Sequence, residues 1–246
     1  MKRRLGTALL RLFTLQGSWN YERMIGVGTG VAEEPLLRDL PGGPGGPAYR
    51  EAVARGARFF NAHPYLAGLA VGAAARAEYD GAPGEQIERL RTALCGPLGS
   101  VGDRLVWAGW LPLTAGLAVA GVALGLGSAA VVAFLVVYNL GHVALRWWAL
   151  RQGWRHGLKV VVALRAPWLQ RAVALAGPGM ALGAGLSLPL AAVWLAGAFE
   201  PWARIALAAC AGVGLLAIRM LPRQVSGLRL GLGLVAVALV AGWVWR

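Results

Sequence analysis

A run of 33 residues without a charged side chain, from Trp107 to Asn139, restricts the fold of this chain more than any other feature. As one straight helix the run would measure roughly 50 Å, whereas the hydrocarbon core of a bilayer is about 30 Å thick. The run is therefore too long for a single span. Pro112 and the Gly125–Leu126–Gly127 step predict a hairpin, either two spans or a re-entrant pair.

The composition supports a membrane location. Hydrophobic residues make up 57% of the 246 residues and charged residues only 14%, against about a quarter in soluble domains. We therefore expect an all-α, multi-pass integral membrane protein with broken or re-entrant helices and about 3–5 membrane segments. Residues 1–103 are expected to form an N-terminal helical part, and residues 104–246 a membrane-embedded helical part.

The charge is distributed unevenly along the chain. Ten of the eleven acidic residues lie at or before Asp103, and the formal net charge is +13. No nucleic-acid motif accompanies this charge, so we expect no nucleic-acid partner. Basic residues interleaved with tryptophan between 146 and 171 instead indicate a cytoplasmic interface with the lipid bilayer. Further apolar runs, 172–199, 205–221 and 230–245, then place the C-terminus outside.

The N-terminal part shows shorter helical patterns. Met1–Gln16 is basic and amphipathic, and it predicts a short helix on the cytoplasmic surface. The glycine- and proline-rich segment Pro41–Pro47 predicts a turn or linker. Helices are expected over Ala48–Phe60 and Leu66–Tyr79, and a third is expected to end at Cys95.

Two segments interrupt these patterns with proline or glycine beside polar groups, Asn61–Pro64 and Gly96–Asp103. Irregular backbone at membrane depth is tolerated where protein or a wet cavity surrounds it, and transporters build substrate sites there. Asn61 and Asp103, with Trp107 nearby, offer the amide, carboxylate and aromatic groups that bind a sugar. Alternatively, both segments are capped loops outside the bilayer. These residues alone leave both readings open.

Other chemistry finds little support. Cys95 and Cys210 form no CxxC pair, so neither a disulfide framework nor a zinc site is indicated. His63 could be a phosphohistidine or a metal ligand, but metal-ligand spacing is absent, which favours a structural or sugar-contacting role. The glycines at 26–30 fit no nucleotide-binding motif. We expect no cofactor and no metal.

Three ordered blocks carry a family resemblance: SWNYERM at 18–24, FFNAHPY at 59–65 and GPLGSVGD at 96–103. Together they resemble the IID component of the mannose/fructose/sorbose family of the sugar phosphotransferase system (PTS). The resemblance extends from Leu15 to the C-terminus.

The resemblance implies a permease subunit in the cell's inner (cytoplasmic) membrane that forms a hetero-oligomer with a IIC membrane subunit. A hexose-type sugar would pass through the pair, and a cytoplasmic IIB protein, supplied by IIA, would phosphorylate it. This chain would not be catalytic alone. We expect Asn61, His63 and Asp103 to contact the substrate. The residues assigned to the pathway or to assembly are Trp19, Asn20, Glu22, Pro64, Gly96, Pro97, Gly102 and Asn139.

The sequence also departs from the family pattern. Arg104 follows the third block where proline or serine is usual, and it could pair with Asp103. His142 stands where arginine is common. Arg104 and the polar stretch before the final basic turn, which is shortened to about Glu200–Arg204, motivate an alternative, a diverged IID homologue with an assembly or regulatory role and no transport. An intramembrane enzyme using Asp103 and His63 is a third hypothesis.

Overall fold

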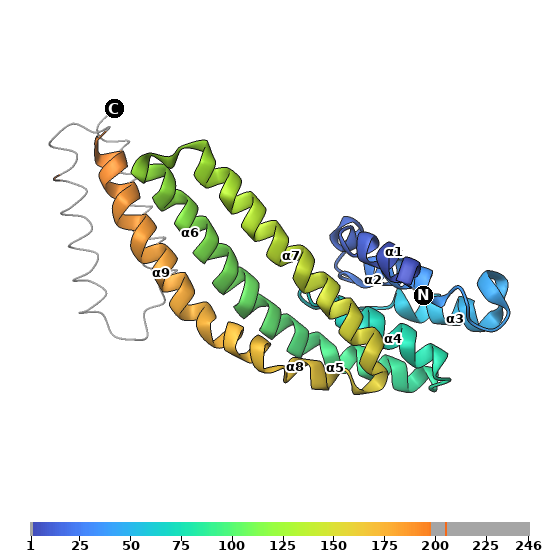
Figure 1. Cartoon of the computed structure of the whole chain (residues 1–246). Coiled ribbons are helices and arrows are strands. Elements are labelled where there is room, and N and C mark those ends of the chain that lie inside the picture. The colour runs from blue at the N-terminus through green and yellow to red at the C-terminus, as the bar shows by residue number, and fades with distance from the viewer. Residues whose placement is uncertain (1, 198–204, 206–246) are drawn as a thin grey trace, which may run out of the picture. The chain divides into compact units, whose positions relative to one another are not determined.

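A computed structural model describes residues 2–197 and residue 205, and this part of the chain is helical without strands (Figure 1). The all-α prediction is therefore confirmed. The α-helices are α1 Lys2–Leu12, α2 Gly26–Leu37, α3 Pro47–Gly56, α4 Gly68–Tyr79, α5 Gly84–Gly102, α6 Leu111–Gly121, α7 Ser128–His156, α8 Val161–Leu164 and α9 Pro167–Gly197. Short 3₁₀ or π segments lie between them: η1 Leu15–Ser18, η2 Gly43–Gly45, η3 Asp103–Trp110, η4 Val122–Leu126 and η5 Gly157–Lys159.

Three helical stretches within the described residues are long and apolar enough to cross a membrane. They are Gly84–Leu126, Ser128–Lys159 and Pro167–Trp194, with mean hydropathy of 1.7, 1.8 and 1.5. This agrees with the expected 3–5 segments. The chain divides into two compact units, residues 1–191 and 192–246. The predicted runs beyond residue 205 and the position of the C-terminus lie outside the described residues.

The predicted hairpin is present at the glycine step. Gly125 and Gly127 adopt φ angles of +92° and +52°, which glycine reaches without the steric cost of a Cβ atom. The chain reverses there, and α7 returns alongside α6 (Figure 1). α9 also approaches α6 closely, because a Cβ atom on Gly116 would lie 2.6 Å from the backbone of Gly183.

The two expected interruptions behave differently. The chain is non-helical at Asn61–Pro64, between α3 and α4, as predicted. At Gly96–Asp103 it stays helical: α5 continues through Pro97 and passes into the π-helical turns of η3 at Asp103. The predicted break of the helix at this segment is therefore wrong: the helix continues and changes from α to π winding. Pro97 is tolerated inside the helix, and its side chain is exposed.

The core of the first unit lies where the N-terminal helices meet α7. The amphipathic helix α1 buries Leu5, Ala8 and Leu12 against this core rather than leaving its apolar face free. α4 is almost fully buried and packs along α7. The two backbones approach closely at Gly72, where a Cβ atom would lie 2.5 Å from the carbonyl oxygen of Leu150. This contact joins the N-terminal part to a membrane helix.

Candidate functional site

One open cavity of about 630 Å³ collects residues from all three sequence blocks. Its wall is mixed in character, with amide, imidazole, hydroxyl and carboxylate groups beside aromatic rings. The lining residues are Gln16, Trp19, Ile25, Phe59, Asn61, Ala62, His63, Pro64, Cys95, Gly96, Gly99, Ser100 and Asp103. Every residue expected to contact the substrate is among them, as are three of those assigned to the pathway or to assembly. We call this space the block cavity.

Short backbone contacts bring the blocks together. Ile25 donates its N–H to the carbonyl of Phe60 at 3.1 Å, and Met24 forms an isolated bridge with the same residue. The third block meets the second at Gly102. A Cβ atom there would lie 2.2 Å from Cβ of His63, so only glycine permits this approach.

Asn20 shapes the first block rather than lining the cavity. Its side-chain oxygen accepts hydrogen bonds from the backbone N–H groups of Glu22, at 3.1 Å, and Arg23, at 2.8 Å. Its amide donates to the carbonyl of Ser18 at 3.2 Å. Such local bonds fix a turn, and this one carries the positive φ of Met24 (+52°). Glu22 is exposed on the turn.

His63 is the most buried polar group of the block cavity, with 2% of its surface exposed. Burial, followed by the charges of Arg146 and His142, lowers the pKa of His63 to about 4, so the ring is neutral at pH 7. Its Nδ1 accepts the N–H of Tyr65 at 3.2 Å, which places the ring proton on Nε2. Nε2 is buried and has no hydrogen-bond partner among the described residues. A buried donor without an acceptor costs about 1–3 kcal/mol, which a ligand oxygen would remove.

Asn61 and Asp103 are exposed on the wall of the block cavity. Amide and carboxylate groups can together donate to and accept from the hydroxyls of a polar ligand. No ion pair joins Asp103 to Arg104 in the described part of the chain, so the carboxylate is not masked in that way. The ring of Trp107 lies 5.1 Å from that of His63, centroid to centroid.

The remaining predicted residues lie outside the cavity lining. Pro97 is on the exposed side of α5, and Gly102 is buried behind the wall. Asn139 is exposed on α7, where its amide donates to the carbonyl of Leu135 at 2.7 Å. Across residues 2–197 no three His, Cys, Asp or Glu side chains gather as a metal site would require.

A polar row on α7 lies next to His63. His142 was noted in the sequence only as a departure from the family pattern, and its grouping with Tyr138 and Arg146 was not predicted. Tyr138, His142 and Arg146 are spaced four residues apart and so share one helix face. The hydroxyl of Tyr138 lies 2.8 Å from that of Tyr65, and the His142 ring stacks on the Tyr65 ring at 4.0 Å. Ionisable residues inside membrane helices are functional candidates by default. The four-residue spacing of these three residues within an apolar helix could therefore have predicted the row from the sequence.

Arg146 connects this row to the second block. Its Nε donates to His142 Nε2 at 2.7 Å, and its Nη1 donates to the carbonyls of Pro64, at 3.2 Å, and Leu12. The guanidinium also lies over the ring of Tyr65, 4.7 Å from the centroid. Arg146 therefore fixes the loop that carries Asn61 and His63 against a membrane helix.

Comparison with known proteins identifies the family. The family model described as the PTS system mannose/fructose/sorbose family IID component matches residues 1–181. The mannose-specific EIID component of Escherichia coli K12 is 30% identical over 167 residues, covering 66% of this chain and 58% of that protein. The sorbose-specific EIID component of Klebsiella pneumoniae is 31% identical over 175 residues, covering 68% of this chain and 62% of that protein. The chain thus spans less than two thirds of these relatives' length.

Solved structures show the same fold. A chain of the mannose transporter ManYZ, in a complex with microcin E492, matches with a TM-score of 0.60 and 22% identity, covering 99% of this chain and 96% of that chain. A second structure, described as a membrane protein, matches with a TM-score of 0.68 and 24% identity, covering 99% and 97%. The three blocks, the membrane-length helices and the family match agree. The chain belongs to the IID components of the mannose/fructose/sorbose family of the PTS.

Proposed function

We propose that this chain forms a sugar pathway together with a IIC-type membrane subunit in the inner (cytoplasmic) membrane. A hexose-type sugar passes through the pair, and a cytoplasmic IIB protein, recharged by IIA, phosphorylates it on arrival. In this proposal the chain carries no chemical step of its own. One observation supports it above the others: residues from three separated blocks line one cavity and present complementary hydrogen-bonding groups.

Each proposed contact uses a different property of its side chain. Asp103 accepts hydrogen bonds from sugar hydroxyls, and Asn61 both donates and accepts. His63 remains neutral and donates from Nε2. Trp19, which is 46% exposed, offers an aromatic surface to the apolar face of a sugar ring. Gly102 lets the helix carrying Asp103 approach the loop carrying His63.

Sugar uptake by cells that co-express the chain with its IIC, IIB and IIA partners tests the proposal. We expect Asp103→Asn and Asn61→Ala each to raise the half-saturating sugar concentration by about fivefold to tenfold, the effect of losing one hydrogen bond. Gln86→Ala is the matched control, because this exposed amide on α5 lies outside the cavity lining. Uptake that is unchanged when the whole chain is omitted would sink the transport role.

A second candidate function is assembly without transport. Arg104 favours it, because this exposed cation neighbours Asp103 at the wall where a neutral sugar would bind. In that case Asn61→Ala leaves uptake unchanged, while deletion of the chain prevents recovery of the IIC–IIB complex. Arg104→Ser separates the two functions, since only a transporting chain would gain sugar affinity from it.

A further inference from the structure

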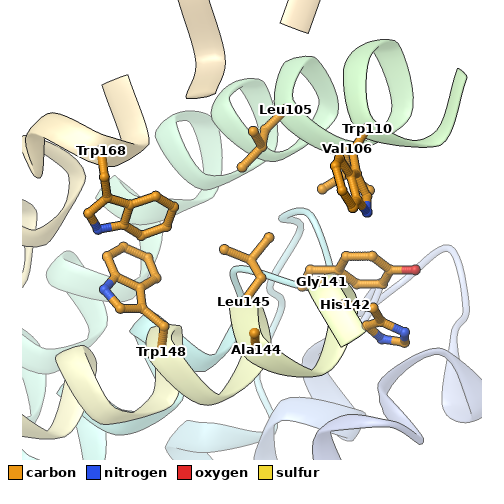
Figure 2. A pocket seen from close by; sticks show the side chains of 10 residues that line it. Leu105, Val106, Trp110, Gly141, His142, Ala144, Leu145, Trp148 and Trp168 are labelled. Atoms are coloured by element: carbon orange, nitrogen blue, oxygen red, sulfur yellow. The ribbon is translucent and has the colours of Figure 1, made fainter. Parts of the chain in front are cut away.

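A second cavity, of about 360 Å³, lies between the three membrane-length stretches. Figure 2 shows Leu105 and Trp110 on one side, Leu145 and Trp148 on α7, and Trp168 at the start of α9. Its lining is mainly hydrocarbon and indole, and the hydroxyl of Tyr65 and the ring of His142 supply its polar side chains. We call this space the indole cavity. A lining of this kind suits an apolar chain and not a sugar.

One polar atom at the indole cavity lacks a partner. Nε1 of Trp110 is buried and makes no hydrogen bond within the described residues. It faces Gly141, where a Cβ atom would lie only 3.0 Å from it (Figure 2). A tryptophan N–H usually finds an acceptor when buried.

The other end of the indole cavity has the character of a membrane interface. The rings of Trp148 and Trp168 meet edge to face at 4.8 Å, and tryptophan is enriched at the headgroup level of bilayers. Arg151 and Arg171, both exposed, follow these two residues by about one helical turn. No acidic residue occurs between positions 104 and 199. The surroundings therefore attract an anion.

We propose that the indole cavity binds an anionic phospholipid, with one acyl chain inside and the phosphate near Arg151 and Arg171. Gly141, which Trp110 faces, precedes Arg151 by ten residues, about 15 Å along α7, so the acyl chain and not the headgroup reaches Trp110. The helices around the cavity are long and apolar enough to lie in lipid. The opening of the cavity would then be surrounded by acyl chains and not by water. The exposed Arg151 and Arg171 favour an occupant with a negatively charged headgroup over an uncharged apolar helix. This site is independent of the proposed sugar pathway.

Lipid retention by the full chain, purified with its membrane partner, tests the proposal by native mass spectrometry. The probes are dioleoyl phosphatidylglycerol and dioleoyl phosphatidylcholine. We expect Ala144→Phe, which places a ring in the cavity and narrows it, to lower bound phosphatidylglycerol by about tenfold. Ala129→Phe, an exposed position on the same helix outside the lining, should not. Equal retention by the two variants would overturn the proposal.

The arginines are tested separately. Each cation near a bilayer surface strengthens anionic binding by about fivefold. Arg151→Gln combined with Arg171→Gln should therefore remove the preference for phosphatidylglycerol while phosphatidylcholine still binds. Arg50→Gln, exposed on α3, is the control. A preference that survives the double substitution contradicts the assignment of the headgroup.

A third measurement needs no variant. Phosphatidylglycerol with a photoreactive diazirine in its acyl chain should label wild-type residues 105–110, 141–148 or 168. Label spread evenly over the exposed apolar face of α7, at 131–140, would refute the site. Ala144→Phe that displaces a co-purifying protein and leaves lipid binding unchanged would assign the cavity to a protein partner instead, and so would also refute it.

Discussion

The carboxyl group of Glu33 is 1% exposed and lies 3.3 Å from the guanidinium of Arg91. Arg91 also donates to the carbonyl of Gly56, at 2.8 Å, and to the hydroxyl of Thr29, at 3.1 Å, so it joins α2, α3 and α5. Burial raises the pKa of Glu33 to about 8, and Arg91 opposes this only in part. Loss of water around the carboxylate outweighs the attraction of one cation.

This shift gives a pH dependence with a defined sign. The folded chain binds a proton at Glu33 that the unfolded chain releases above pH 4.5, so stability falls as pH rises from 4.5 through about 8. We expect the melting temperature of the wild type to be higher at pH 6 than at pH 8.5, and Glu33→Gln to flatten that slope. Glu85→Gln, at an exposed position, should keep it. An unchanged slope in Glu33→Gln would contradict the assignment.

Arg146 is 3% exposed, and its fork-shaped side chain serves His142 and two carbonyl oxygens at once. Lysine keeps the charge but is a point donor that cannot match this planar geometry. We expect Arg146→Lys to lower the free energy of unfolding by about 2 kcal/mol, measured by thermal denaturation in detergent. Arg155→Lys, in the exposed last turn of α7, is the control and should have little effect. Equal melting temperatures would show that only the charge matters.

Among the elements, the crossing of α4 and α7 depends on glycine. A Cβ atom at Gly72 would lie 2.5 Å from both the carbonyl oxygen of Leu150 and the nitrogen of Trp154. Gly72→Ala must push these backbones apart, so we expect it to destabilise the fold by about 1–3 kcal/mol. Gly177→Ala, within α9, meets nothing within 4 Å and should be neutral or stabilising. Thermal denaturation of both variants checks the difference, and equal effects would exclude close packing as the cause.

Local patterns were sufficient to predict most elements. The uncharged run at 107–139 and its glycine step predicted the hairpin, because backbone reach and bilayer thickness leave few alternatives. The same reasoning failed at Gly96–Asp103. A helix can absorb Pro97 there, and the change to π winding at Asp103 is not encoded in any short pattern. Local propensity therefore predicted that the helix is irregular at this segment, but not that the irregularity is a change from α to π winding.

At the scale of the whole molecule, the block cavity was only partly predictable. The family resemblance implied that Asn61, His63 and Asp103 contact one substrate, but no local pattern shows how His63 and Asp103 come together. Their approach depends on tertiary packing, in which Gly102 fits against His63. Arg91 and Arg146 were not identified either, because a buried arginine looks in sequence like any interfacial one. Apart from His142, which is four residues from Arg146, the hydrogen-bond partners of these two side chains lie 35 to 134 residues away.

The distribution of charge also predicts a sidedness. If the basic segment at 146–171 faces the cytoplasm, the turn between η4 and α7 faces the exterior. In a chain with Cys95 and Cys210 replaced by serine, Ser128→Cys should react with a membrane-impermeant maleimide on intact cells. Gln152→Cys should react only after the cells are opened. The reverse pattern would show the opposite orientation.

The partners of Arg146 also have an implication for biogenesis. Leu12 and Pro64 precede Arg146 by 134 and 82 residues, so they leave the ribosome first, and N-terminal segments fold first during synthesis. When α7 is synthesised, the two carbonyl oxygens that accept hydrogen bonds from Arg146 are therefore already part of the nascent chain. A translation product lacking residues 1–64 would have to insert the same helix without the two carbonyl oxygens that bind Arg146.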